Sequence, residues 1–122
     1  MYKILYILFP ILLLSCKSDA QLAMERGIKL YDWNKLDDAI VEFNKVKYLL
    51  DYDGKQSLES IQLLAQAHFN LGITYAKMEL YNQAEQEILN ALSLIPNKEY
   101  RDVLNMVRSK MQSLGPSATV AP

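Results

Sequence analysis

The sequence predicts an all-α fold in which antiparallel helical hairpins stack into an α-α superhelix. Apolar side chains recur at three- and four-residue steps, which is the period of an amphipathic helix. One such stripe comprises Ile61, Leu64, His68, Leu71 and Tyr75. A pair of small residues also occurs twice at the same spacing, because twelve positions separate Gly27 from Ala39 and Gly72 from Ala84. A repeated spacing of this kind indicates two copies of one helical unit.

Length and composition limit what the protein can do. A chain of 122 residues with 51% apolar content can bury one small core. Lys and Arg alternate with Asp and Glu, and the formal net charge is -1, so the basic face of a nucleic-acid binder is missing. One cysteine and one histidine cannot build an internal disulfide or a zinc cluster. We therefore expect no metal, no nucleic acid and no bound cofactor.

The N-terminal segment has the features of a secretory signal. Lys3 precedes an apolar run over residues 4–14, which Pro10 interrupts and which is too short to span a bilayer as a helix. Residues 13–16, Leu-Leu-Ser-Cys, resemble the lipobox of bacterial lipoproteins. The resemblance implies that residues 1–15 are a signal peptide and that residues 16–19 begin the mature chain with acyl chains on Cys16. An ordinary signal peptide is the alternative.

The resemblance also bears on location. Lys17 follows the cysteine, where some bacteria place an aspartate to retain lipoproteins at the inner membrane. The expected location is therefore the cell envelope, with a lipid anchor in the outer membrane and the protein facing the periplasm.

Residues 65–98 carry a motif with fixed spacings. Large, small and aromatic residues alternate there in a set order: His68, Leu71, Gly72, Tyr75, Ala84, Ile88, Ala91 and Pro96. This pattern resembles the 34-residue tetratricopeptide repeat (TPR). Residues 20–53 form an earlier, weaker copy, which keeps Gly27, Leu30, Ala39, Phe43 and Val46. Ala23, Arg26 and Asp51 depart from the pattern.

The resemblance implies two antiparallel helices in each repeat, with small residues where helices cross and large ones between them. Asn34 and Glu79 occupy the tight turns within the two hairpins. Residues 54–64 are an insertion that extends the helices, with Ser57 as an N-cap. Residues 99–114, preceded by the cap Asn97, form an amphipathic capping helix, and residues 115–122 a disordered tail.

In proteins with such repeats, partners bind along the inner surface that the first helices of the hairpins form. The corresponding positions here are Met24, Ile28, Tyr31, Gln66, Phe69, Ile73 and Lys77. Most of them are apolar, so they predict a groove for an apolar or aromatic segment rather than a clamp for a carboxylate. The alternative is that these side chains pack neighbouring first helices together. His68 and Trp33 are expected to serve packing.

The expected function is that of a membrane-anchored adaptor or assembly subunit that binds other proteins of the envelope. Two repeats offer a short array, so a partner or a second copy of the chain can complete it. Two alternatives stay open. One is a carrier of a small apolar ligand in the groove. The other is an enzyme, which we do not expect, because the sequence shows no nucleophile with a base and no carboxylate pair.

Overall fold

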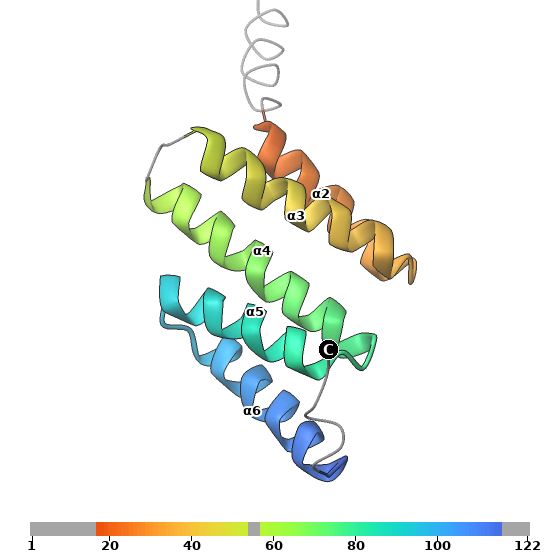
Figure 1. Ribbon diagram of the computed structural model, residues 1–122. Coiled ribbons are helices and arrows are strands. Elements are labelled where there is room, and N and C mark those ends of the chain that lie inside the picture. Colours follow the sequence, from red (N-terminus) through yellow and green to blue (C-terminus); the bar gives the residue numbers. More distant parts are fainter. Residues whose placement is uncertain (1–16, 54–56, 116–122) are drawn as a thin grey trace, which may run out of the picture.

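The computed structural model describes residues 17–53 and 57–115, which form a row of antiparallel helices (Figure 1). The helices of these residues are α2 (Asp19–Asp32), α3 (Leu36–Asp53), α4 (Leu58–Lys77), α5 (Tyr81–Leu94) and α6 (Lys98–Ser113). The expected fold class, an all-α stack of helical hairpins with a further C-terminal helix, is confirmed. The expected signal peptide, Cys16 and the tail beyond Gly115 lie outside the described residues.

The two hairpins turn in the same way. Asn34 and Glu79 have positive φ angles of 60° and 62°. After each turn a backbone N–H donates to a carbonyl near the end of the first helix, from Lys35 to Leu30 and from Leu80 to Tyr75. A left-handed backbone suits asparagine better than glutamate, so the second turn is the more strained of the two.

Side chains satisfy the N-terminal backbone groups of three helices. Ser18 and Ser57 form capping boxes at α2 and α4, in which the serine accepts from the third residue of the helix and that residue's side chain accepts from the serine N–H. Asn97 accepts from the Tyr100 N–H at the start of α6. Helix α4 therefore begins seven residues before Ala65, as its cap predicts.

Glycines set the distance between the helices of each hairpin. A Cβ atom on Gly27 would lie 2.5 Å from Cε1 of Phe43, and one on Gly72 would lie 2.5 Å from Cγ1 of Ile88. Both contacts are closer than van der Waals distance, so the helices can cross as they do only without side chains there. The repeated Gly and Ala spacing in the sequence reflects this crossing.

Two adjoining cores hold the stack together. The first comprises residues of α2, α3 and α4, with Phe43, Val46 and Leu71 fully buried. The second comprises residues of α4, α5 and α6, with Ile88 fully buried. Tyr75 packs against both cores, and α4 contributes to both. The stack is therefore one continuous unit, with α4 at its centre.

Helix α6 covers the open end of the second hairpin. Tyr100, Leu104 and Val107 are buried on its inner side, while most of its other side chains are polar and exposed. The ring of Tyr100 stacks on Phe69 of α4, with 4.4 Å between centroids and 24° between planes. This arrangement is that of a helix that ends a stack.

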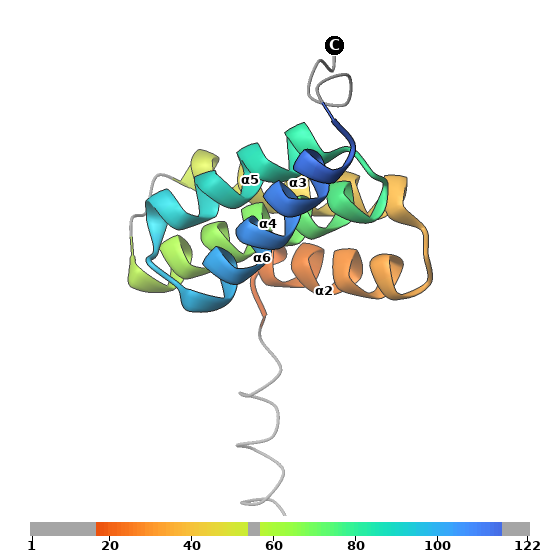
Figure 2. The same ribbon diagram turned by 90° about the horizontal axis from the view of Figure 1, so that it is seen from below.

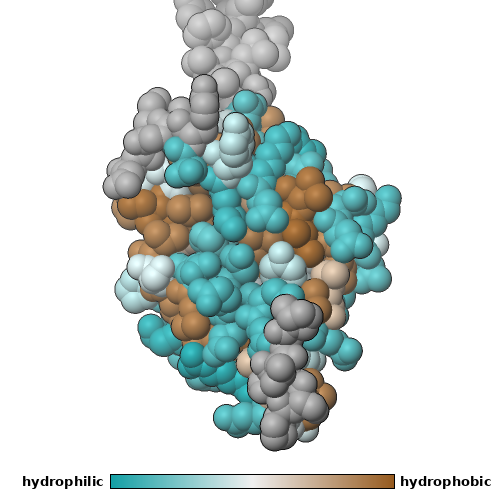
Figure 3. Space-filling view, viewed as in Figure 1, coloured by the Kyte–Doolittle hydropathy of each residue, from teal (hydrophilic) through white to brown (hydrophobic). Residues whose placement is uncertain are grey.

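Seen from below, the helices form two layers (Figure 2). Helices α2 and α4 lie in one layer, and α3 and α5 in the other. In the view of Figure 1 polar residues cover most of the surface, and apolar residues form separate patches (Figure 3). Among residues 17–53 and 57–115, no helix combines the length and the apolar character that crossing a bilayer requires.

Candidate functional site: the inner surface of α2, α4 and α6

Two cavities lie side by side along α4. The first, of about 310 Å³, opens between α2 and α4, and the second, of about 410 Å³, opens between α4 and the start of α6. Gln66 of α4 lines both. We call the continuous face that lines these two cavities the inner surface.

The cavity between α2 and α4 has an apolar floor and a polar rim. Met24, Ile28 and Leu63 supply the floor. At the rim Lys17 Nζ donates to Glu25 Oε1 over 2.5 Å, and this hydrogen bond, with the lysine charge, lowers the pKa of Glu25. Nearby, Gln21 Nε2 donates to Glu59 Oε1 over 3.1 Å and so joins the first turns of α2 and α4.

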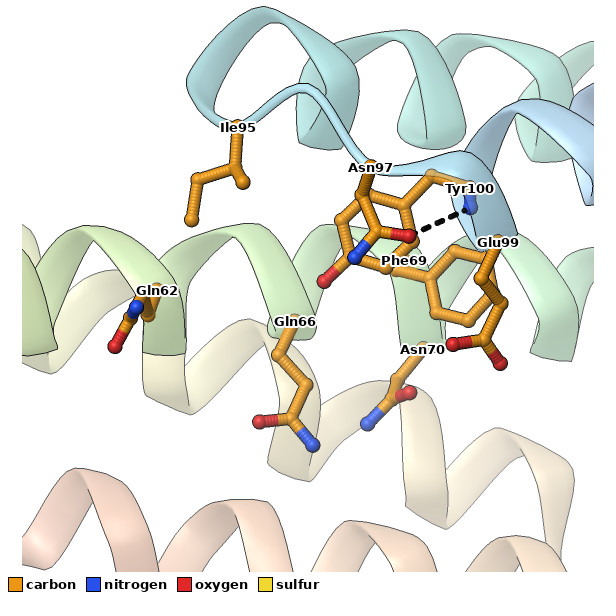
Figure 4. A pocket seen from close by; sticks show the side chains of 8 residues that line it. All are labelled: Gln62, Gln66, Phe69, Asn70, Ile95, Asn97, Glu99 and Tyr100. Atoms are coloured by element: carbon orange, nitrogen blue, oxygen red, sulfur yellow. Dashed lines mark hydrogen bonds between the residues drawn. The ribbon is translucent and has the colours of Figure 1, made fainter.

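Amide side chains gather in the cavity between α4 and α6 (Figure 4). Gln62, Gln66 and Asn70 follow one another at four-residue steps on α4, so they lie on one side of the helix. Asn97 faces them from the loop before α6. Asn70 is only 9% exposed and donates to the sulfur of Met24, whereas the side chain of Gln66 extends into the cavity.

The structure separates the seven residues of the predicted groove into buried and accessible ones. Met24 is 4% exposed and Phe69 8%, so these two side chains pack between helices, which was the alternative to a groove. Ile73 is half-buried against the second core. Ile28 and Gln66 are exposed on the inner surface. Lys77 lies 4.6 Å above the ring of Tyr31 and closes the far end of the contact between α2 and α4.

Phe69 is covered because α6 provides Tyr100. Of the two interpretations of Phe69, groove or packing, the structure agrees with packing, and the accessible surface is richer in amides than the sequence suggested. Sequence reasoning missed Gln62 and Asn97 as parts of this surface. The four-residue spacing of Gln62, Gln66 and Asn70 was a usable signal, whereas the approach of Asn97 depends on how α6 docks.

His68 belongs to a charged cluster that joins three helices on the other side of α4. Its Nδ1 lies 2.6 Å from Oε2 of Glu87 on α5, and Lys47 Nζ of α3 lies 3.7 Å from the other carboxylate oxygen. Burial acts to raise the pKa of Glu87, but the hydrogen bond from His68 and the charge of Lys47 outweigh it and hold this pKa below its usual value. His68 thus packs against the stack, with an ionic partner that its sequence position did not reveal.

Trp33 does not pack locally as expected, because its side chain is 67% exposed at the end of α2. Within the part of the chain that the structure describes, no group of three or more His, Cys, Asp or Glu side chains could hold a metal ion. Among the residues of the repeated motif, Ala39, Ala84 and Ala91 are fully buried, Leu30 is half-buried and Pro96 follows α5.

Comparison with known proteins leaves the family open. The chain matches no protein-family model, and no curated protein matches it. The helical hairpins are thus shown by the structure, and membership of the tetratricopeptide family stays a prediction from the motif.

Proposed function

We propose that the protein is a lipid-anchored module of tetratricopeptide type that binds an extended segment of another envelope protein on its inner surface. The observation that carries the proposal is the row of amides on α4, of which Gln66 reaches both cavities. The lipobox at residues 13–16 supports the anchor.

The chemistry of the row fits a polypeptide backbone. A primary amide both donates and accepts a hydrogen bond, as does each peptide group. Side chains four residues apart on a helix are separated by a rise of about 6 Å. Every second residue of an extended chain advances by about 6.6 Å. Gln62 and Gln66 can therefore bind successive outward-facing peptide groups of one strand-like segment.

The apolar floor between α2 and α4 adds a preference for a partner segment that carries an apolar side chain. Ile28 is 38% exposed there beside the half-buried Leu63. A partner segment with an apolar side chain near one end buries it against this floor while the amides hold its main chain. Backbone recognition with one apolar contact tolerates varied sequences, which suits an adaptor.

Crosslinking tests this proposal. A photoreactive residue in place of Gln66 should link the chain to a specific protein in native membranes, because Gln66 lies in both cavities. The matched control is the same residue in place of Gln83, an exposed glutamine of α5 in the other layer. Gln66 is a better site than Phe69, whose ring is covered by Tyr100.

The partner found in this way should bind the Gln62→Ala, Gln66→Ala double variant at least about tenfold more weakly, since two buried hydrogen bonds are lost. Gln83→Ala should leave its affinity unchanged. Equal crosslinking from both positions, or a partner whose affinity the double variant retains, contradicts binding at the inner surface.

The carrier of a small apolar ligand is a second candidate, favoured only by the floor that Met24, Ile28 and Leu63 form. Native mass spectra of the protein purified from membranes distinguish the two functions. A retained lipid that Ile28→Asn displaces supports the carrier, and a chain without added mass beyond its own acyl groups supports the adaptor.

A further inference from the structure

Four exposed side chains form a stripe along α2. Leu22, Arg26, Lys29 and Trp33 follow one another at steps of four, three and four residues, so they share one side of the helix. We call them the α2 stripe. Leu22 is 38% exposed and Trp33 67%.

The α2 stripe faces away from α4. Gln21, Met24 and Tyr31 mark the side of α2 that contacts α4. The α2 stripe lies on the opposite side, where Arg26 Nε pairs with Glu42 Oε2 of α3 over 3.2 Å. Helix α2 is also the outermost helix of the row, at the end opposite to α6 (Figure 1).

The two ends of the stack differ in chemistry. On α6 the exposed side chains are mainly polar, with Met106 and the C-cap residue Leu114 as exceptions. The α2 stripe instead has an apolar residue at each end and two cations between them. Leucine and tryptophan enter the boundary of headgroups and acyl chains, and Arg and Lys bind lipid phosphates. A surface of this composition can therefore lie against a membrane.

The short length of chain between Cys16 and α2 indicates that a membrane is what covers the α2 stripe. Cys16 stands two residues before Ser18, the N-cap of α2. Two extended residues span about 7 Å, whereas the 14 residues of α2 span about 21 Å. Acyl chains on Cys16, which are part of the proposed function, therefore hold the first turn of α2 within reach of the headgroups, whatever the rest of the stack does.

We propose that the α2 stripe is a membrane-docking surface, so that α2 lies flat on the lipid with Trp33 in the interface. This places the end of the stack on the bilayer and α6 farthest from it. The inner surface belongs to another side of α2, so it stays open sideways and a partner can bind while the protein is docked.

The single tryptophan of the chain reports on this directly. Lipidated protein is purified from membranes and placed in vesicles of phosphatidylcholine and phosphatidylglycerol, with or without bromine on the acyl chains. We expect brominated lipid to quench the Trp33 emission strongly. The matched control combines Trp33→Phe with Met106→Trp, because Met106 is also 67% exposed but lies on α6. This control should keep its emission.

Each other outcome overturns the proposal. Equal quenching of both proteins shows no fixed orientation. A second variant combines Trp33→Phe with Leu58→Trp, at the start of α4. Quenching of this variant alone shows that the start of α4, and not the α2 stripe, contacts the lipid. A Trp33 emission that changes with protein concentration in the absence of lipid shows that a second copy covers the stripe.

The mass of the peptide that contains Cys16 shows whether the lipid anchor is present, and so tests the anchor separately from the docking surface. An acylated Cys16 with unquenched Trp33 overturns the docking surface and leaves the anchor in place. An unmodified Cys16 removes the anchor and the docking surface together. Replacing Arg26 and Lys29 by glutamine in the acylated protein should weaken the quenching, because the phosphate contacts are lost.

Discussion

Gly27 shows how one absent side chain sets the spacing of a whole hairpin. Its Cα faces the ring of Phe43, which is 1% exposed and cannot move into solvent. Glycine inside a helix lowers stability by about 1 kcal/mol relative to alanine. The sequence accepts this cost at Gly27 and Gly72 because the close crossing allows Phe43 and Ile88 to be fully buried.

Gly27→Ala is therefore expected to destabilise the protein although alanine favours helix. Overpacking costs about 1–3 kcal/mol, and better helix propensity offsets up to about 1 kcal/mol of it, so we expect a net loss of about 1 kcal/mol in urea unfolding. Adding Phe43→Leu makes room for the new methyl group. The double variant should be more stable than the sum of the two single losses, and simple additivity would show that the crossing is not tight.

The cluster of Lys47, His68 and Glu87 makes the free energy of unfolding depend on pH in the acid range. The pKa of Glu87 in the folded protein lies below its usual value of 4.5. Folding then favours the carboxylate, so this contribution is complete above pH 4.5 and is lost as the pH falls through the lowered pKa. The ion pairs of Glu87 with His68 and Lys47 are the source of this contribution to the free energy of unfolding.

Glu87→Gln should accordingly lower the unfolding free energy at neutral pH and flatten its decline in acid. Thermal melts followed by circular dichroism between pH 7 and pH 3 measure this difference. Glu79→Gln, in the exposed turn between α4 and α5, serves as the control and should keep the slope of the wild type. An acid decline in Glu87→Gln as steep as that of the wild type would contradict the assignment.

At the scale of elements, α6 decides how much of α4 is accessible. The Tyr100 ring lies on Phe69, and Leu104 and Val107 extend the contact along the second core. The helix therefore both ends the stack and forms one wall of the cavity that Gln66 lines. Stability and the shape of the site depend on the same helix.

Tyr100→Ala should lower the unfolding free energy by about 3 kcal/mol or more, the usual cost of truncating a buried aromatic side chain. Met106→Ala on the outer side of α6 should change it by less than about 0.5 kcal/mol. Chemical denaturation measures both. A small loss in the first variant would mean that α6 is held by contacts other than the aromatic stack.

The elements were largely predictable because their signals are local. Helical periodicity, the serines at residues 18 and 57, and the repeated spacing of glycine and alanine are all properties of neighbouring residues. The inner surface was predictable only in part. Ile28 and Gln66 lie there as expected, but the burial of Phe69 depends on Tyr100, which is 31 positions away and arrives through the docking of α6.

At the scale of the whole molecule, the first hairpin has no core of its own, and both cores share α4. The first core includes Ala67 and Leu71 of α4, and the second includes Ala65 and Phe69 of the same helix. The Lys47–Glu87 pair also joins α3 of the first hairpin to α5 of the second. The stack should unfold as one cooperative unit.

A fragment of residues 17–53 should therefore be largely unfolded, because it lacks the α4 side chains that complete its core. A fragment of residues 17–115 should melt in a single transition. Circular dichroism of both tests this. A cooperative melt of the shorter fragment would show that the first hairpin is an independent domain.

The row of amides on α4 is short, and this fixes the length of ligand that the protein can read. From Gln62 to Asn70 the helix rises by about 12 Å. A strand advances about 3.3 Å per residue, so a segment that follows the row contacts it over about four residues. The molecule is thus suited to recognising a short linear motif, and longer epitopes must find their remaining contacts elsewhere.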